Sequence, residues 1–181
     1  MKKTKNLALK PTGFPENIVL IGMFGSGKST VGRLLAHKLR YHFIDVDHLI
    51  EARYRLPLRK VMDKLGLKDF MRMEDGVLQT LHYQRCVIAP GGSAVYYPKS
   101  MRHLKKLGTC VFLKAELKVL ARRVGDWEQQ PVVRKGGNTL PALFRERAPL
   151  YRKYADLTVE IKGKSFEKIA SEILKQLSLQ G

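Results

Sequence analysis

Five short apolar runs alternate along this chain with longer stretches whose apolar residues recur every three or four positions. The runs cover residues 17–21, 42–44, 86–89, 109–113 and 157–161. Short continuous apolar runs are typical of strands that are buried on both faces, and the recurring spacing is typical of helices. The predicted helices cover residues 28–40, 48–53, 58–64, 70–84, 98–107, 116–123, 140–154 and 165–177.

Alternation of strands and helices predicts an α/β fold with a five-stranded parallel sheet between two layers of helices. One segment, residues 124–139, fits neither spacing and contains Gly125, Pro131, Gly136 and Gly137. Glycine and proline at irregular positions predict a loop. Because long loops in compact domains often cover active sites, we predict that this segment is a mobile lid.

A glycine-rich loop joins the first predicted strand to the first predicted helix. Residues 22–29 read Gly-Met-Phe-Gly-Ser-Gly-Lys-Ser and satisfy the phosphate-loop pattern G-x-x-x-x-G-K-[ST]. In such a loop, backbone N–H groups surround the phosphates, Lys28 reaches the β- and γ-phosphates, and the Ser29 hydroxyl binds Mg²⁺. The pattern predicts ATP and Mg²⁺ as cofactors, bound by Gly25, Ser26, Gly27, Lys28, Ser29 and Thr30.

Two carboxylates, Asp45 and Asp47, follow the second predicted strand. Ligands of open α/β sheets bind at the carboxyl ends of the strands, so we expect both residues beside the phosphate loop at the end of that strand. One carboxylate of such a pair can bind near Mg²⁺ while the other accepts a proton from an attacking hydroxyl. Without the phosphate loop, the same pair would be read as a helix N-cap, and Asp47 can serve as a cap as well.

Size and composition predict one domain spanning residues 1–181, with residues 1–15 as a flexible tail. The chain contains no apolar run of about 18 residues, the length that a membrane-spanning helix needs. Its N-terminus lacks the pattern of a secretory signal, so we expect a cytoplasmic protein. Cys86 and Cys110 lie within apolar runs and are expected to be buried thiols.

The net charge of +18 arises from 34 Lys and Arg residues against 16 Asp and Glu residues. Such a charge attracts polyanions, including nucleic acids. The basic residues are spread along the whole chain, which argues against a dedicated nucleic-acid site. We therefore expect small phosphorylated ligands rather than nucleic acid as partners.

With these motifs in place, nearly the whole chain resembles the shikimate kinase family of small P-loop kinases. The matching segments are the phosphate loop, Asp45 with Asp47, Phe70 with Glu74, residues 90–93 and residues 147–151. The resemblance implies the P-loop kinase fold, a monomer, and ATP-dependent phosphorylation of a shikimate hydroxyl in aromatic amino-acid biosynthesis. It also implies that Asp45, with Ser29, lies near the metal.

The resemblance assigns roles to the remaining candidate residues. Asp47 holds the substrate hydroxyl, and with Lys28 and Arg147 it forms the catalytic set. The turn at Gly91 and Gly92 contacts the substrate through its backbone, and Arg147 pairs with the substrate carboxylate. A further candidate, Arg123, matches an arginine that lies against adenine.

This chain departs from the family pattern at three positions. Where the family has a substrate-binding arginine after the phenylalanine, this chain has Met71. The lid arginine of the family is Gln130 here, and the third glycine of the substrate turn is Ser93. A charged bidentate hydrogen bond contributes about 1.5–3 kcal/mol, so losing one arginine weakens acid binding by about one to two powers of ten. Candidates to supply the missing charge are Arg72, Arg134 and Lys135.

The departures leave alternatives open beside a shikimate kinase. A second hypothesis keeps the phosphate loop but changes the acceptor to another polyhydroxy acid, a polyol or a nucleotide. A third, from another class, is a nucleotide-binding regulatory or RNA-binding protein that uses the positive charge to hold a polyanion.

Overall fold

The computed structural model describes residues 13–134 and 139–179. Its centre is a sheet of five parallel strands in the order β2-β3-β1-β4-β5. The strands are β1 (Asn17–Ile21), β2 (His42–Asp45), β3 (Cys86–Ala89), β4 (Thr109–Lys114) and β5 (Leu157–Glu160). The predicted five-stranded parallel sheet is confirmed, and each strand lies within about one residue of its predicted bounds.

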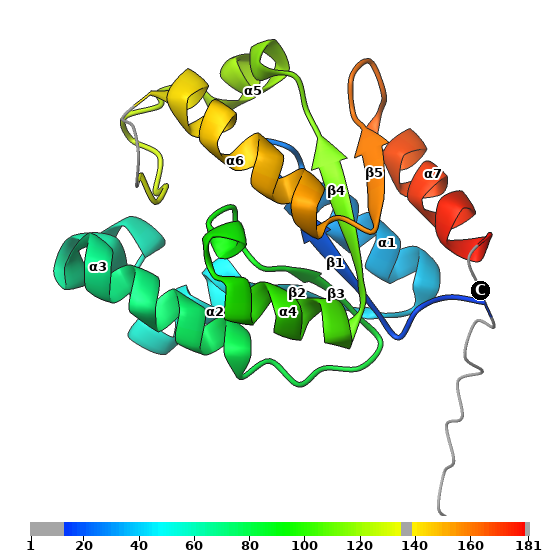
Figure 1. Cartoon of the computed structure of the whole chain (residues 1–181), viewed down its shortest axis with the longest axis horizontal. Helices are drawn as coiled ribbons and strands as arrows, with labels where there is room; N and C mark the ends of the chain where they lie inside the picture. The colour runs from blue at the N-terminus through cyan, green and yellow to red at the C-terminus, as the bar shows by residue number, and fades with distance from the viewer. Residues whose placement is uncertain (1–12, 135–138, 180–181) are drawn as a thin grey trace, which may run out of the picture.

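Helices cover both faces of this sheet (Figure 1). Helices α1 and α7 pack against each other on one face, and α4 and α6 lie on the other. The helices are α1 (Lys28–Leu39), α2 (Val46–Tyr54), α3 (Leu58–Gln79), α4 (Pro98–Leu107), α5 (Leu117–Val124), α6 (Leu140–Tyr154) and α7 (Phe166–Ser178), with one 3₁₀ turn, η1 (Ala94–Tyr96). This arrangement confirms the predicted three-layer α/β/α fold.

The region between β2 and β3 differs from its prediction. Two helices were expected over residues 58–64 and 70–84, but the structure has one helical segment, α3, bent at Gly66. Gly66 has a φ of 72°, outside the helical range, so the two predicted helices are joined there by a kink. Helix α3 ends at Gln79, five residues before the predicted end, and residues 80–84 form a loop.

The core lies on both faces of the central strands. Every residue of β1 and β3 is buried, which explains why these strands appear in the sequence as continuous apolar runs. Cys86 and Cys110 are buried free thiols, as predicted. Within the described residues, no helix is long and apolar enough to cross a membrane.

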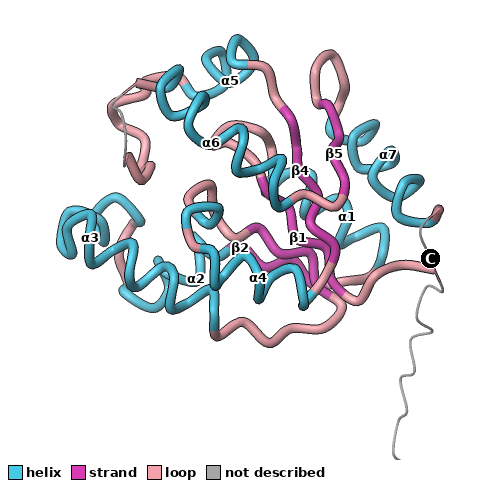
Figure 2. The backbone as a smooth tube through the Cα atoms, in the orientation of Figure 1, coloured by secondary structure: helices cyan, strands magenta, loops and turns pink. Residues whose placement is uncertain are grey.

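The loops that follow the carboxyl ends of the strands approach one another on one side of the molecule (Figure 2). These loops include the phosphate loop after β1, the start of α2 after β2 and the turn after β3. The fold therefore places most of the predicted site residues at this edge, where ligands of open α/β sheets bind.

Candidate active site

The phosphate loop passes directly from β1 into α1. Gly27 is the N-cap residue of α1 and has a φ of 93°, in the left-handed region that favours glycine. A Cβ atom on Gly27 would lie 2.6 Å from Cε1 of Phe166, so the Phe166 ring would have to move to admit one. The loop therefore favours glycine here for both its backbone angle and its contact with α7.

Lys28 lies folded across the loop. Its Nζ atom donates hydrogen bonds to the carbonyl oxygens of Gly22 (3.0 Å) and Met23 (3.1 Å). Burial lowers the pKa of Lys28 to about 8, although the nearby carboxylates of Asp47 and Asp45 oppose this change. A lysine in this state is held ready to bind a phosphate, whose negative charge would favour its protonated form.

Ser29 and Asp45 form the candidate metal site. The Ser29 hydroxyl donates a 2.7 Å hydrogen bond to Oδ2 of Asp45, so two hard oxygen ligands lie side by side at the N-terminus of α1. The described residues contain no group of three or more His, Cys, Asp or Glu side chains that could hold a metal. This donor set fits Mg²⁺, which binds through one or two protein ligands together with substrate phosphates and water.

A pocket of about 270 Å³ lies against the loop, and we call it the phosphate pocket. Its walls come from the phosphate loop, the end of β2 and the turn after β3. The lining residues are Phe24, Gly25, Gly27, Lys28, Ser29, Thr30, Asp45, Asp47, Ala89 and Gly91. Among the residues predicted to bind the nucleotide, Ser26 is buried and does not line this pocket.

Arg123 lies at the edge of the phosphate loop. Its Nη1 donates to the Gly25 carbonyl oxygen (3.4 Å), and its guanidinium carbon lies 5.1 Å from the ring centre of Phe166. The structure thus places Arg123 beside the nucleotide loop and pairs it with an aromatic ring. Phe166 was not predicted as a site residue, because nothing in the sequence near position 166 links it to the loop.

The two carboxylates lie on different elements. The expectation that both end the second strand was wrong for Asp47: Asp45 is the last residue of β2, and Asp47 is in the first turn of α2. Asp45 is the N-cap residue of α2 but makes no capping hydrogen bond with its side chain. Burial, with the charge of Asp45, raises the pKa of Asp47 to about 6. A carboxylate with a pKa near neutrality is suited to accept a proton.

Asp47 also lines a second, smaller pocket of about 20 Å³, which we call the inner pocket. It is lined by Phe24, Asp47, Leu58, Phe70, Glu74, Gly92, Ser93, Pro131, Val132, Val133 and Arg147. Val132 and Val133 belong to the predicted lid, and both are buried. This part of the predicted lid therefore forms a wall of the pocket, and Asp47 and Phe24 line both pockets.

Arg147, on α6, is buried in the wall of the inner pocket with only 1% of its surface exposed. Its Nε donates to the hydroxyl of Tyr96 (3.1 Å), and its Nη2 donates to the carbonyl oxygen of Val133 (2.6 Å). The guanidinium also lies over the Tyr96 ring, 4.8 Å from its centre. A buried cation needs a partner, and here the backbone carbonyl of Val133, in the predicted lid, accepts one of its hydrogen bonds.

Glu74, on α3, is a second buried charge that the sequence did not assign to the site. Its carboxylate accepts hydrogen bonds from Ser93 (2.6 and 2.7 Å) and from Tyr97 (2.5 Å). Burial raises the pKa of Glu74 to about 7, and these hydrogen bonds oppose that rise. Tyr97 had no signal in the sequence, because its contact with Glu74 spans 23 residues.

Glu74→Gln is expected to flatten the pH dependence of stability. The pKa of Glu74 rises from 4.5 to about 7 on folding, so the native state binds more protons between these values and its stability falls as pH increases. The shift corresponds to about 3 kcal/mol of unfolding free energy lost across that range. Urea unfolding at pH 5 and pH 7.5 measures the change. Glu167→Gln, at an exposed position of α7, should keep the pH dependence of the unfolding free energy seen in the wild type.

Two of the three candidates for the missing charge can be located. Arg72 is exposed (73% of its side chain) and pairs with Asp69 on the outer face of α3, so it does not reach the inner pocket. Arg134 donates to the carbonyl oxygen of Trp127 (2.7 Å) and lies over its ring. Lys135 lies outside the described residues.

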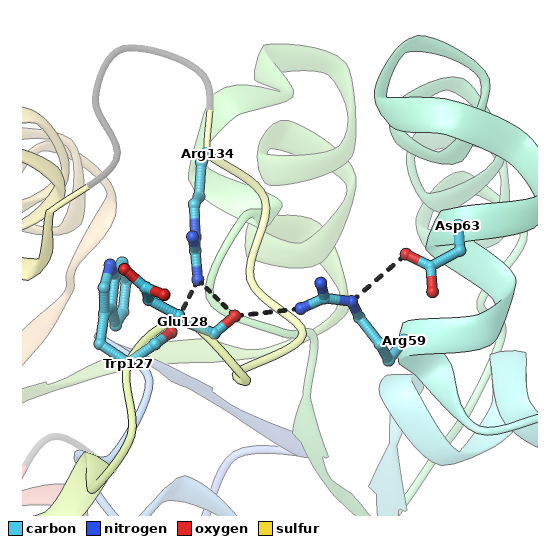
Figure 3. A network of polar contacts seen from close by, with 5 residues as sticks. All are labelled: Arg59, Asp63, Trp127, Glu128 and Arg134. Carbon is cyan, nitrogen blue, oxygen red and sulfur yellow. Dashed lines mark hydrogen bonds and ion pairs between the residues drawn. The ribbon is translucent and has the colours of Figure 1, made fainter.

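A network of polar contacts joins the predicted lid to α3 (Figure 3). The carbonyl oxygen of Glu128 accepts from Arg134 (3.2 Å) and from Arg59 (3.1 Å), and Arg59 also pairs with Asp63. At position 130, where the family pattern has an arginine, Gln130 instead donates to carbonyl oxygens within the lid. These contacts join the predicted lid segment to α3.

Comparison with known proteins identifies the family to which this site belongs. The sequence model of the shikimate kinase family matches residues 24–178. The chain belongs to the shikimate kinase family. A shikimate kinase of Caldanaerobacter subterraneus is 33% identical over 88% of this chain and 95% of its own length. One of Chromohalobacter salexigens is 36% identical over 91% of this chain and 92% of its own length.

A solved structure of a shikimate kinase leads to the same family assignment. The shikimate kinase of Acinetobacter baumannii, solved in complex with shikimate, is 31% identical and has a TM-score of 0.84. The alignment covers 91% of this chain and 94% of that one. Since shikimate kinases as a family use ATP with Mg²⁺, the predicted cofactors are those of the family.

Proposed function

We propose that this member of the shikimate kinase family transfers the γ-phosphoryl group of ATP to a hydroxyl of shikimate. The observation that carries the proposal is that Asp47 lines two pockets, one formed by the phosphate loop and the other by Arg147. A phosphoryl donor in the first pocket and a hydroxyl acceptor in the second would both lie beside this carboxylate. This matches the reaction that the family carries out.

The residues of the phosphate pocket position the donor. Lys28 leaves its two loop carbonyls to bind the β- and γ-phosphates, and the N-terminus of α1 adds its positive end. Ser29 and Asp45 would hold Mg²⁺, which neutralises the charge that develops on the phosphate oxygens when bound. Asp47 orients the acceptor hydroxyl and takes its proton.

Arg147 binds the acid group of the acceptor. The carboxylate of shikimate would replace the carbonyl oxygen of Val133 on Nη2 of Arg147, and a charged partner makes the stronger hydrogen bond. Because the inner pocket holds only about 20 Å³ while Val133 is in place, acceptor binding requires the lid to move outward first. Residues 124–139 are therefore proposed to act as the lid of this enzyme.

Steady-state ADP release tests this function. The assay uses saturating MgATP with and without millimolar shikimate, and Lys28→Ala serves as the blank. Shikimate-dependent ADP release well above the blank supports the proposal. A background rate alone, in protein that still binds ATP, would reject shikimate as the acceptor and direct the search to other hydroxy acids, polyols and nucleotides.

Arg147→Lys is expected to weaken shikimate binding. Lysine keeps the charge but not the planar fork that binds a carboxylate through two parallel bonds. Loss of one charged hydrogen bond corresponds to about a 10- to 100-fold rise in the KM for shikimate. The KM for MgATP should stay unchanged. Arg72→Lys, on the exposed face of α3, is the matched control; an equal effect of both variants would remove Arg147 from the acceptor site.

The remaining predictions concern the molecule as a whole. We propose that residues 1–181 act as one kinase domain and as a cytoplasmic monomer, with ATP and a small hydroxyl acceptor as partners. Residues 1–12 of the predicted tail lie outside the described residues. The charge of +18 is not assigned to nucleic acid, since the basic residues are spread along the whole chain. Binding of RNA that survives about 0.15 M salt would contradict this proposal.

A further inference from the structure

Ser93 stands where the family pattern has a glycine, and its side chain contacts the acceptor site. The residue is 6% exposed, lines the inner pocket and is the N-cap residue of the 3₁₀ turn η1. Its hydroxyl lies 2.6 and 2.7 Å from the two carboxylate oxygens of Glu74. A glycine at this position would leave Glu74 with Tyr97 as its remaining side-chain donor among the described residues.

Glu74 lies close to the proposed catalytic carboxylate. A Cβ atom built on Gly91 would be 3.1 Å from Oδ1 of Asp47 and 3.2 Å from Oε1 of Glu74. Both oxygens therefore lie near the same point of the turn that contains Gly91. A carboxylate offers about four acceptor positions, and Ser93 and Tyr97 supply two donors, so Glu74 can still accept a hydrogen bond from a ligand in the pocket.

Met71 explains why Glu74 needs a different partner in this chain. Residues 71 and 74 are three positions apart on α3, so an arginine at 71 would lie next to the Glu74 carboxylate. Met71 carries no donor, and Arg72 points into solvent and pairs with Asp69. Within the described part of the chain, no ion pair to Glu74 is formed. A buried carboxylate requires donors, and hydroxyl groups supply them here.

We propose that Ser93 is a positioning residue, which fixes Glu74 so that its carboxylate accepts a hydrogen bond from a hydroxyl of the bound acceptor. This inference rests on the proposed function of the inner pocket. In this proposal the two sides of the pocket bind different groups of the acceptor. Arg147 binds the acid group, and Glu74 binds a hydroxyl. The acceptor is then a polyhydroxy compound with one acid group held by one arginine.

Kinetics of Ser93→Ala and Ser93→Thr test the proposal. We expect Ser93→Ala to raise the KM for shikimate about tenfold, the effect of one lost hydrogen bond to a charged group, with kcat within about threefold of wild type. The KM for MgATP should not change. Ser93→Thr keeps the hydroxyl and should restore most of the affinity. Failure of threonine to restore it would show that the size of residue 93, and not its hydroxyl, sets the KM.

Ser100 supplies the matched control. Its hydroxyl is also buried and donates to a carboxylate of α3, that of Asp75, but it lies outside the inner pocket. Ser100→Ala should leave the KM for shikimate unchanged. Shikimate analogues that each lack one non-reacting hydroxyl provide a sharper test. Wild type should bind one of these analogues less tightly than it binds shikimate. Ser93→Ala should bind that analogue and shikimate with equal affinity. Equal discrimination by both proteins would overturn the proposal.

A measurement without substrate separates this inference from the proposed function. The unfolding free energies of Ser93→Ala, Glu74→Gln and the double variant form a double-mutant cycle. Coupling between the two positions is expected, and independent effects would overturn the inference whatever the acceptor is. If the wild type does not phosphorylate shikimate but the cycle shows coupling, the proposed function fails and the contact between Ser93 and Glu74 stands. Met71→Arg in the Ser93→Ala background should then restore stability by giving Glu74 a new partner.

Discussion

Asp47→Asn is expected to lower the shikimate-dependent kcat by about 10²- to 10⁴-fold, the usual contribution of a general base. Asparagine keeps the shape of the side chain but cannot take a proton from the acceptor hydroxyl. The structure supports this role, since Asp47 lines both pockets and has a pKa raised to about 6 by burial and by Asp45. Steady-state ADP release with saturating MgATP and shikimate measures the loss.

Nucleotide binding separates a catalytic role of Asp47 from a structural one. Asp47→Asn removes one negative charge near the phosphates, which relieves repulsion and does not weaken nucleotide binding. The Kd for a non-hydrolysable MgATP analogue should therefore change by no more than about threefold. Asp69→Asn, an exposed position on α3, should keep both activity and binding. If Asp47→Asn no longer binds the nucleotide analogue, Asp47 serves the phosphate pocket and is not the base.

Most of the fold could be predicted because its local signals agree with its tertiary structure. Buried parallel strands such as β1 and β3 are continuous apolar runs, so their bounds follow from hydrophobicity alone. The bend at Gly66 could not be predicted, since a helix kink and a loop between two helices share the same glycine signal. The 3₁₀ turn η1 was also missed, because three residues are too few to show a period.

Part of the candidate site could also be predicted from the sequence, and part could not. The phosphate loop could be predicted because its chemistry lies in eight consecutive residues that fold next to one another. Asp45 ends β2 and Asp47 lies two residues later, so only the start of α2 between them was missed. The group around Glu74 could not be predicted, because its partners Ser93 and Tyr97 are 19 and 23 residues away and are joined to it by tertiary packing.

Lys28→Ala is expected to lower kcat by about 10²- to 10³-fold, the cost of removing one donor that stabilises transition-state charge. The Nζ atom of Lys28 is free to leave its present partners, since both are carbonyl oxygens of the same loop and the γ-phosphate is a stronger, charged acceptor. Rapid-quench measurement of the phosphoryl-transfer step reports this loss directly. Lys64→Ala, at an exposed position of α3, is the matched control and should behave as wild type.

The pH dependence of kcat/KM for MgATP provides a second test of the role of Lys28. Burial lowers the pKa of Lys28 to about 8, so its positive charge is present below that pH and is lost as pH rises through it. The kcat/KM for MgATP should therefore fall above about pH 8. At saturating MgATP the phosphates favour the protonated lysine, and the fall in kcat should move to higher pH. If kcat/KM for MgATP and kcat both fall at the same alkaline pH, a group other than Lys28 controls that fall.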